Sequence, residues 1–476
     1  MIPLPKIIAR IYLKYSGEEP LSVVQLPPTA SDRVYFRITS PSGQTFIATQ
    51  SSNLRENASF INLSHHFVSH KLNVPRILHV EPDFSVYIQD DLGDTTLFSL
   101  LQENTENRIT DTIRNHYKQA LEQLVRFQLD ASSDLDFSHC YPVEAFDKQA
   151  IMWDLNYFKY YFLKPSGIHF EEDLLEIDFH TIANSLLADH LKYFMFRDFQ
   201  SRNILISNNK PWFIDYQGGR KGPILYDLAS CILDAKANLP INFRNELVDF
   251  YYKLLPSHIK PERDYFNNKL AVCKMVRLLQ AFGAYGFRGM IQKKTLFLQS
   301  IPYAAANLKL LLSDNIPLKL PHLTPLLEAI TEKYGIIEQH QKTDTLTVRI
   351  YSFSYRKGIP EDNSTNGGGF VFDCRSLPNP GRIAEMQTKT GFDTEVKLIL
   401  ESEDTVGRFL VSATELSTSA IDNYLCRKFT DIMISFGCTG GQHRSVFCAN
   451  TLAAILQKEY SGDKLVIDVI HRELKR

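Results

Sequence analysis

The chain has 476 residues, 44% of them hydrophobic and 22% charged, which excludes a disordered chain and leaves room for two or three folding units. Its 52 Lys and Arg nearly balance 54 Asp and Glu, so no general attraction to nucleic acid or anionic lipid is expected. Seven widely spaced cysteines without a C-x-x-C pair argue against disulfides or a zinc-thiolate site and favour a reduced cytoplasm. We expect no signal peptide and no membrane span, because no apolar run approaches about 18 residues.

The first 110 residues predict a small sheet interrupted by one helix. Residues 33–39 and 45–50 alternate apolar and polar side chains around a Pro-Ser-Gly turn, as hairpin strands do. Helical spacing follows at 60–72, and strands return at 76–80 and 85–92.

Two histidines of this helix, His66 and His70, have the i,i+4 spacing of metal-ligand pairs. Their neighbourhood in the sequence offers no Glu or Asp partner. A solvated helix face is therefore the favoured interpretation.

From Thr110 onward the pattern becomes mainly helical. Residues 113–129 place apolar side chains on one face of a helix. We expect further helices at 147–163, at 172–192 and through most of 226–335, and short strands or loop segments at 193–199, 204–207 and 211–216.

The strongest chemical signal is the segment FRDFQSRNILISNNKPWFIDY. Phosphoryl transfer needs a carboxylate that orients the acceptor hydroxyl and ligands for the metal that neutralises phosphate charge. We expect Asp198 to be the catalytic base and Asn203 and Asp215 to be Mg²⁺ ligands. The alternative is that Asp198 and Asn203 only cap a turn.

Residues 15–310 resemble the aminoglycoside phosphotransferase-like (choline kinase-like) family, and most of all its N-acetylmuramate/N-acetylglucosamine anomeric kinases. The narrower likeness rests on residues 31–37, 90–94, 152–158, 197–203 and 214–230. The resemblance implies an α+β bilobal protein-kinase-like fold with an N-lobe at 1–92 and a C-lobe at 93–337. It also implies ATP and Mg²⁺ as cofactors and an amino sugar as the acceptor.

Nucleotide contacts are implied for Ser31 and Arg33 in a phosphate loop and for the backbone of Asp90 and Leu92 at the hinge between lobes. Asp90 and Leu92 could equally belong to an ordinary turn at the end of a strand. The loop has no glycine, and strand 47–50 lacks the lysine that pairs with phosphate in kinases. A degenerate, non-catalytic domain is therefore a second interpretation.

Acceptor contacts are implied for Asp154, Asn156 and Arg202. Asp154 and Asn156 could equally be polar positions on an amphipathic helix. Asp227 is expected to support the catalytic loop from behind.

A polar linker at 338–346 precedes a change of pattern. Strands at 347–355, 369–375 and 431–437 alternate with helices at 419–429 and 445–460, before a last segment at 464–474. This order predicts a separate α/β domain over 347–476.

A buried strand of this domain runs through a Gly-rich turn into a helix, which is the arrangement of a phosphate-binding loop. Its expected phosphate-binding residues are Cys438, Thr439, Gly440, Gly441, His443, Arg444 and Ser445. Cys438 and Arg444 also fit the C-x5-R pattern of cysteine-dependent phosphatases, although packing of the cysteine beneath the loop is favoured.

The motif GCTGGQHRSV, with residues 351–360, 370–380, 390–393 and 471–476, resembles the C-terminal domain of the RNase adapter family RapZ. The resemblance implies a sugar-phosphate site completed by Arg356, with Arg375 and Asn379 as further candidates. It also implies self-association and small-RNA binding. RNA binding is not favoured, because basic and acidic residues are equally numerous over 345–476.

The sequence thus predicts an ATP- and Mg²⁺-dependent amino-sugar kinase joined to a domain that binds a sugar phosphate and could mediate a homo-oligomer. The alternatives are a degenerate kinase acting as a sugar-phosphate sensor or RNA-regulatory adaptor, and a cysteine-dependent phosphatase.

Overall fold

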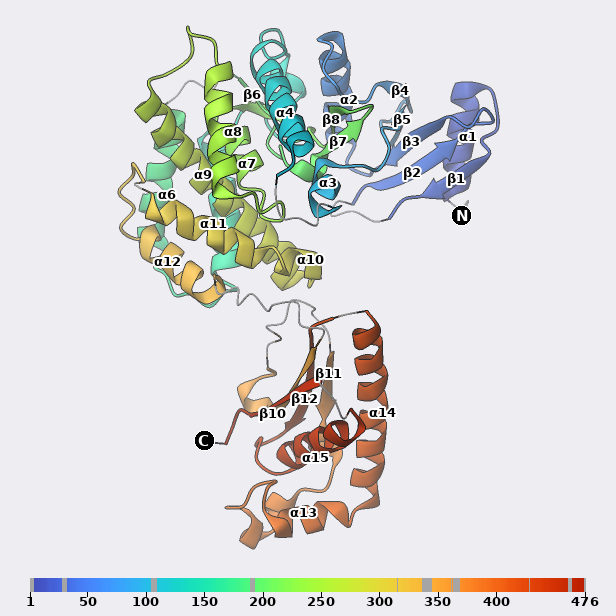
Figure 1. Cartoon of the computed structure of the whole chain (residues 1–476), viewed down its shortest axis with the longest axis vertical. Helices are drawn as coiled ribbons and strands as arrows, with labels where there is room; N and C mark the ends of the chain where they lie inside the picture. The colour runs from blue at the N-terminus through green and yellow to red at the C-terminus, as the bar shows by residue number, and fades with distance from the viewer. Residues whose placement is uncertain are drawn as a thin grey trace. The chain divides into compact units, whose positions relative to one another are not determined.

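The computed structural model describes residues 4–27, 32–103, 109–188, 193–314, 316–335, 345–360, 362, 369–427, 429–460 and 465–474 (Figure 1). The chain divides into two compact units, Met1–Ile336 and Ile337–Arg476, and each is described by itself. The predicted linker at 338–346 lies almost entirely outside the described residues.

The first unit begins with a five-stranded antiparallel sheet in the order β1-β2-β3-β5-β4. Four of its strands were predicted, two of them from alternating side chains. The first helix, α1 (Leu4–Ser16), was not predicted, although its Ile8, Ile11 and Tyr12 form a buried stripe with helical spacing. The strands are β1 (Ser22–Gln25), β2 (Val34–Thr39), β3 (Thr45–Gln50), β4 (Ile77–Val80) and β5 (Val86–Asp90).

Helix α2 (Leu54–Ser69) begins earlier and ends earlier than the predicted 60–72. Asn53 sets its start, because the Asn53 side chain accepts a hydrogen bond from the amide of Glu56 at 3.3 Å. The Glu56 carboxylate in turn accepts from the Asn53 amide nitrogen at 3.3 Å. This reciprocal cap resembles a capping box and fixes Glu56 in the first turn of the helix.

The rest of the first unit is mainly helical and packs against one large apolar core. The strands here form two small antiparallel pairs, β6 (Tyr193–Met195) with β9 (Arg220–Gly222), and β7 (Ile204–Ser207) with β8 (Lys210–Phe213). The helices are α3 (Leu97–Glu103), α4 (Asp111–Leu129), α5 (Lys148–Phe158), α6 (Glu172–Leu187), α7 (Tyr226–Ile232), α8 (Ile241–Leu254), α9 (Arg263–Tyr285), α10 (Thr295–Leu298), α11 (Ile301–Ser313) and α12 (Leu323–Tyr334).

Helix α9 ends where the chain passes very close to the π-helical segment Lys159–Leu163 that follows α5. A Cβ atom at Gly286 would collide with the backbone carbonyl of Tyr161. Because backbone cannot move aside as a flexible side chain can, we expect Gly286→Ala to destabilise the protein by about 1–3 kcal/mol in urea unfolding. Gly218→Ala is the matched control, since a Cβ there meets no atom within 4 Å. Equal stability of the two variants would contradict the inferred close approach.

The second unit is built on a four-stranded, fully parallel sheet in the order β11-β12-β10-β13. Its strands are β10 (Leu346–Ser354), β11 (Gly369–Asp373), β12 (Asp431–Cys438) and β13 (Leu465–His471). Its helices are α13 (Thr394–Glu401), α14 (Asp404–Cys426) and α15 (Arg444–Glu459). Helix α14 is much longer than the predicted 419–429, and α13 was not predicted.

The parallel register brings the carboxyl ends of three strands together. Ser354 pairs with Cys438, and Asp373 pairs with Gly437. Open parallel sheets bind ligands at this edge, so the predicted loop starts at a favourable place. None of the helices in the described ranges is both long and apolar enough to cross a membrane.

Candidate functional site

The segment around Asp198 is folded back on itself by the β7–β8 hairpin. Asn208 and Asn209 make its turn with φ values of 50° and 58°, the left-handed conformation that asparagine tolerates and that tight hairpins require. The hairpin returns the chain so that Asp215, directly beyond β8, lies beside Asn203, directly before β7.

Hydrogen bonds join the three residues that the sequence motif singled out. The amide nitrogen of Asn203 donates to the backbone oxygen of Asp198 at 2.9 Å and to Oδ2 of Asp215 at 3.3 Å. Because Asn203 uses its nitrogen for both contacts, its amide oxygen is the atom that can ligate a cation. Asp198, Asn203 and Asp215 therefore belong to one site.

Asp215 has the electrostatics of a metal ligand. Burial, and then the nearby charge of Asp198, raise the pKa of Asp215. Its Oδ1 accepts from Gln217 at 2.7 Å, and its φ of 68° is a strained conformation. A divalent cation would relieve the repulsion between the two carboxylates, so the residues present fit Mg²⁺ or a similar ion.

Asp198 is accessible and is accompanied by a buried cation. Its side chain is 41% exposed, and Nη2 of Arg277 on α9 lies 3.7 Å from its Oδ1. Arg277 is itself held by Ser230, to whose hydroxyl its Nε donates at 3.0 Å. Arg277 was not predicted from the sequence, in which it and Lys274 are the charges of a largely apolar stretch of α9.

Asp227 supports the catalytic loop from behind, in agreement with its expected role. Its two carboxylate oxygens accept the backbone amides of Phe196 at 2.7 Å and Arg197 at 2.8 Å. Burial raises the pKa of Asp227 to about 7. These contacts hold Arg197 at a φ of 82° and thereby set the direction of the next residue, Asp198.

We expect Asp227→Asn to destabilise the protein by about 1–3 kcal/mol in thermal unfolding. The asparagine nitrogen would face one of the two backbone N–H groups and leave it without an acceptor. Asp264→Asn, an exposed change on α9, is the control and should have little effect. An unchanged melting temperature of Asp227→Asn would show that the loop does not depend on this carboxylate.

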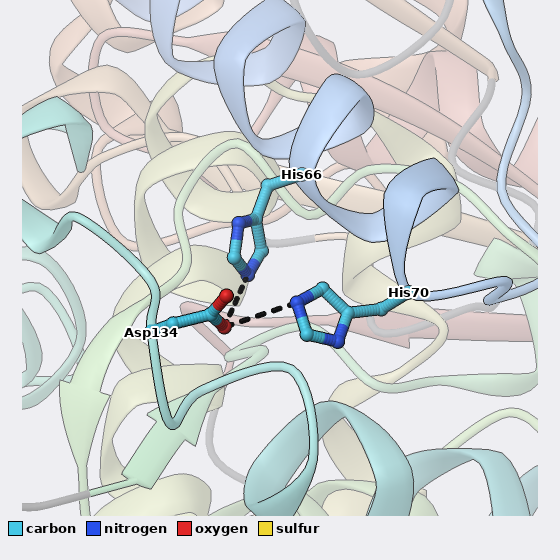
Figure 2. A group of neighbouring side chains, drawn as sticks. All are labelled: His66, His70 and Asp134. Atoms are coloured by element: carbon cyan, nitrogen blue, oxygen red, sulfur yellow. Dashed lines mark ion pairs between the residues drawn. The ribbon is translucent and has the colours of Figure 1, made fainter.

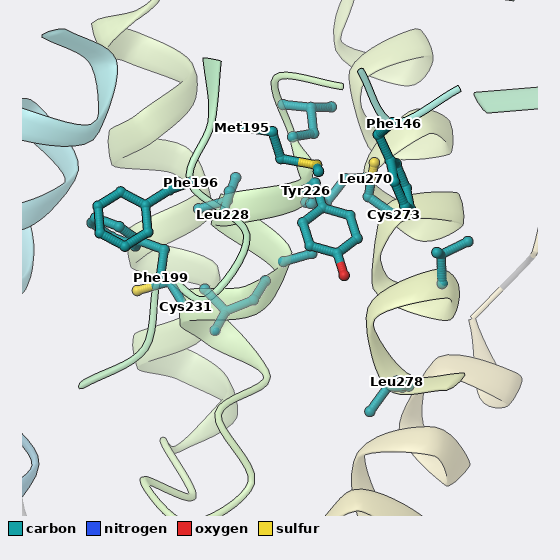
Figure 3. Close-up of a cluster of buried hydrophobic side chains, with 14 of the residues drawn as sticks. Phe146, Met195, Phe196, Phe199, Tyr226, Leu228, Cys231, Leu270, Cys273 and Leu278 are labelled. Carbon is teal, nitrogen blue, oxygen red and sulfur yellow. The ribbon is translucent and has the colours of Figure 1, made fainter. Parts of the chain in front are cut away.

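Aromatic packing holds the loop from the other side (Figure 3). Phe196 stands where protein kinases carry histidine, and its ring lies 5.4 Å from Phe199 and 5.7 Å from Phe127, centroid to centroid. Tyr226 of α7 belongs to the same core. Burial raises the pKa of Tyr226, and the charges of Arg197 and Arg277 oppose that rise. The brace is therefore apolar, and loss of the histidine leaves the loop packed.

Arg33 is a buried cation close to Glu56 and Asp215. Its Nη2 lies 3.4 Å from Oε1 of Glu56 on α2, and its side chain is 4% exposed. Burial alone would lower the pKa of Arg33, but Tyr87, Tyr35, Glu56 and Asp215 together raise it. Its Nε and Nη2 make no hydrogen bond within the described part of the chain.

The Arg33–Glu56 pair lies near the strand that lacks a lysine. β2 and β3 pair Val34 with Gln50, so Arg33 lies beside the end of the strand that lacks a lysine. In protein kinases a β3 lysine pairs with a glutamate of the following helix, and here Glu56 is on the helix that follows β3.

The remaining predicted nucleotide contacts have weaker structural support. Ser31 lies outside the described residues. The Asp90 amide donates to the carbonyl of Arg76 at 3.1 Å, so a nucleotide contact at Asp90 would have to use its carbonyl oxygen. Leu92 follows two residues later and is half-buried.

The hinge segment is tied to the sheet by a charge cluster. Nε of Arg37 donates to Asp91 at 2.6 Å, and the terminal nitrogens of Arg37 donate to Asp94 at 2.8 and 2.9 Å. Two carboxylates on one guanidinium fix the turn after β5 relative to β2. Asp91 and Asp94 of the motif DDLGD thus have a structural role.

The predicted acceptor residues are not all brought together. Asp154 is buried and paired with Arg197, with Oδ1 and Nη2 2.6 Å apart. Asn156, two residues on along α5, points about 200° away around the helix and cannot share a subsite with Asp154. Arg202 lies near Lys236, whose pKa is lowered by burial and then by the Arg202 charge.

In the second unit, the predicted loop begins where the central strand β12 ends. Thr439 and Gly440 are exposed, and a Cβ at Gly440 would meet nothing within 4 Å, so this part of the loop is open. Gly441 has a φ of 71° and packs against the end of β10. The hydroxyl of Ser354 donates to the Thr439 carbonyl at 2.7 Å and ties the loop to the sheet.

Cys438 lies beneath the loop. Its sulfur accepts the Gly441 amide at 3.2 Å and hydrogen-bonds the hydroxyl of Ser445 at 3.2 Å. Burial opposes ionisation, but the Ser445 and Gly441 contacts and the charge of Arg444 lower the pKa of the Cys438 thiol. Packing beneath the loop, the favoured interpretation of this cysteine, agrees with the geometry, although the thiol has an activated environment.

Arg444 and His443 face the neighbouring segments of the domain. Nη1 of Arg444 donates to the carbonyls of Arg375 and Leu377, both at 2.9 Å. Nε2 of His443 lies 2.8 Å from the Met386 carbonyl. Both side chains are buried, so they hold the loop in place, and only their remaining nitrogens could contact an anion.

Arg356 lies at the same edge of the sheet as the loop but is exposed, and its amide donates to the Ser354 hydroxyl at 3.2 Å. Beside it, the guanidinium of Arg375 stacks 3.9 Å above the ring of Tyr355. A basic edge therefore adjoins the open part of the loop.

The first unit has the layout of a kinase-like fold, a small antiparallel sheet with its helix followed by a larger helical part that carries the Asp198 loop. Residues 22–261 match the phosphotransferase enzyme family APH, and the chain belongs to this family. Residues 346–475 match the RapZ C-terminal domain. The predicted bilobal kinase-like fold followed by a separate α/β domain is confirmed.

Two curated relatives each match about a quarter to a third of the chain. A nucleotide-binding protein of Thermotoga sp. (strain RQ2) is 37% identical over 131 residues, 25% of this chain and 45% of that protein. One of Clostridium botulinum (strain 657) is 38% identical over 149 residues, 31% of this chain and 47% of that protein. The chain thus spans about half the length of these relatives.

Solved structures match about two thirds of the chain. A choline/ethanolamine kinase family protein from Mesorhizobium loti has a TM-score of 0.43 and 15% identity, covering 67% of this chain and 94% of that one. Choline kinase from Cryptosporidium parvum has a TM-score of 0.46 and 13% identity, covering 68% and 99%.

Proposed function

We propose that the first unit transfers the γ-phosphoryl group of ATP to a hydroxyl of a small acceptor. The observation that carries this proposal is the convergence of Asp198, Asn203 and Asp215 on one hairpin. Asp198 orients the acceptor hydroxyl and accepts its proton, while Asn203 and Asp215 hold Mg²⁺. The bound cation supplies neutralisation of phosphate charge.

Arg33 is proposed as the protein's own contact to the phosphates. Its pairing with Glu56 and its proximity to Asp215 favour an active enzyme over a degenerate one. ATP consumption with an acceptor separates these alternatives, since an active enzyme would turn over and a degenerate domain would bind a sugar phosphate without turnover.

The acceptor is proposed to be an N-acetylated amino sugar. This acceptor class is implied by the resemblance of residues 31–37, 90–94, 152–158, 197–203 and 214–230 to the N-acetylmuramate/N-acetylglucosamine anomeric kinases. The charges around Asp198 are balanced, since Arg277 accompanies Asp198 and Arg197 is paired with Asp154.

The test is a phosphate-transfer screen with N-acetylglucosamine, N-acetylmuramate, glucosamine and an aminoglycoside, followed by NMR of the product. We expect transfer to the N-acetylated sugars, with the new phosphate on the anomeric oxygen. Preference for the aminoglycoside would overturn the proposed acceptor while leaving the kinase itself intact.

For the second unit we propose a sugar-phosphate site at residues 438–445, supported by the strand–loop–helix geometry and by the exposed Thr439 and Gly440. The kinase product is the natural ligand, so product sensing joins the two units. Thr439→Glu should abolish sugar-phosphate binding in calorimetry without altering kinase turnover. Unchanged binding would place the ligand elsewhere.

A cysteine-dependent phosphatase is a second candidate for this loop, favoured only by the lowered pKa of the Cys438 thiol. It predicts phosphate release that Cys438→Ser abolishes. Equal release by wild type and Cys438→Ser would eliminate it.

A further inference from the structure

A second group of metal-ligand side chains lies outside the Asp198 site. His66 and His70 stand one turn apart at the end of α2, and Asp134 reaches them from the segment after α4 (Figure 2). Nε2 of His70 is 3.0 Å and Nε2 of His66 is 3.7 Å from Oδ1 of Asp134. All three potential ligand atoms lie within 4.8 Å of one another.

The potential ligand atoms are close enough to one another to bind a single ion. Zinc binds imidazole nitrogen and carboxylate oxygen at about 2.0–2.2 Å, so small side-chain rotations would place all three atoms around one ion. Nε2 of His66 also hydrogen-bonds the backbone carbonyl of Ala131 at 2.6 Å, a contact that Zn²⁺ binding through Nε2 would replace, and a water molecule would be the fourth ligand. The set of two imidazoles and one carboxylate suits Zn²⁺ better than Mg²⁺ or Ca²⁺.

Burial also suits a metal site. The two imidazoles are 18% and 25% exposed, which limits their freedom, and the Asp134 carboxylate is 64% exposed, which leaves the site open to solution. The rings of His66 and His70 lie 4.7 Å apart, centroid to centroid. None of the three residues contacts Asp198, Asn203 or Asp215 in the described part of the chain.

We propose that His66, His70 and Asp134 bind Zn²⁺ and thereby fasten α2 to the turn at 130–134. Helix α2 carries Glu56 in its first turn, and Glu56 pairs with Arg33, so a metal at the other end of the helix would stabilise the helix that holds this pair. The role is structural. It does not depend on the identity of the acceptor or on kinase activity.

The experiment uses the full-length, tag-free Cys426→Ser protein, because Cys426 is exposed and could bind metal adventitiously. After chelator treatment and dialysis, Co²⁺ is titrated in excess Mg²⁺, which keeps the Asp215 site filled. We expect one equivalent of Co²⁺ with the visible absorption of a four-coordinate N/O site, displacement by Zn²⁺, and a higher melting temperature with Zn²⁺.

Asp134→Asn and His70→Ala should each weaken Zn²⁺ binding at least about tenfold. His65→Ala is the matched control, since His65 is the exposed neighbour on the same helix. Asp134 is an exposed residue, so Asp134→Asn should fold even if a histidine variant does not. Absence of the Co²⁺ spectrum, or equal binding by Asp134→Asn and His65→Ala, would overturn the site and leave a histidine–aspartate hydrogen-bond cluster.

Discussion

Asp198→Asn is expected to lower kcat for phosphoryl transfer about 10²- to 10⁴-fold. The amide keeps the shape of the side chain but cannot accept the proton of the acceptor hydroxyl. Because Asp198 is 41% exposed and its neighbour Arg277 is held independently by Ser230, the loop should keep its structure. The measurement is steady-state kinetics with the best acceptor of the screen.

Two further measurements test whether the loss of kcat is specific to the role of Asp198 as base. Mg²⁺-ATP binding should survive in Asp198→Asn, because Asn203 and Asp215 are untouched, whereas Asp215→Asn should lose it. Asp264→Asn, exposed on α9, should turn over like wild type. A variant at position 198 that retains most of the wild-type kcat would remove Asp198 from the role of base.

The functional residues that could be predicted from the sequence are those that lie within one short segment. Asp198, Asn203 and Asp215 are joined by a single hairpin, so their spacing already indicates that they meet. The loop after β12 is equally local, and a strand, glycines and a helix start suffice to place it.

Contacts between elements far apart in the sequence could not be predicted. Arg277 reaches Asp198 from α9, and Asp134 reaches His66 from the segment after α4. The directions of side chains could not be predicted either. Arg444 fits C-x5-R in the sequence, yet its guanidinium donates to carbonyls of a neighbouring turn. Spacing identifies which residues are present, while tertiary packing decides where they point.

Arg33→Ala is expected to lower kcat/KM for ATP roughly 10- to 100-fold, the loss of one or two charge-assisted contacts to phosphate. The acceptor KM should change little, since Arg33 lies with Glu56 and Asp215 on the nucleotide side of the site. Arg33→Lys should retain part of the activity. Because the Arg33 guanidinium is buried, the melting temperature of each variant must be measured alongside.

A rescue experiment separates a phosphate contact from a merely structural role. The β2–β3 register pairs Tyr35 with Thr49, and Tyr35 shares the sheet face of Arg33, so a lysine at position 49 would lie on the face of the vacated guanidinium. If Arg33 substitutes for the β3 lysine of other kinases, Thr49→Lys should restore part of the ATP kcat/KM lost in Arg33→Ala. Recovery of stability without recovery of kcat/KM would instead assign Arg33 to packing against Phe60, whose ring lies 5.9 Å away.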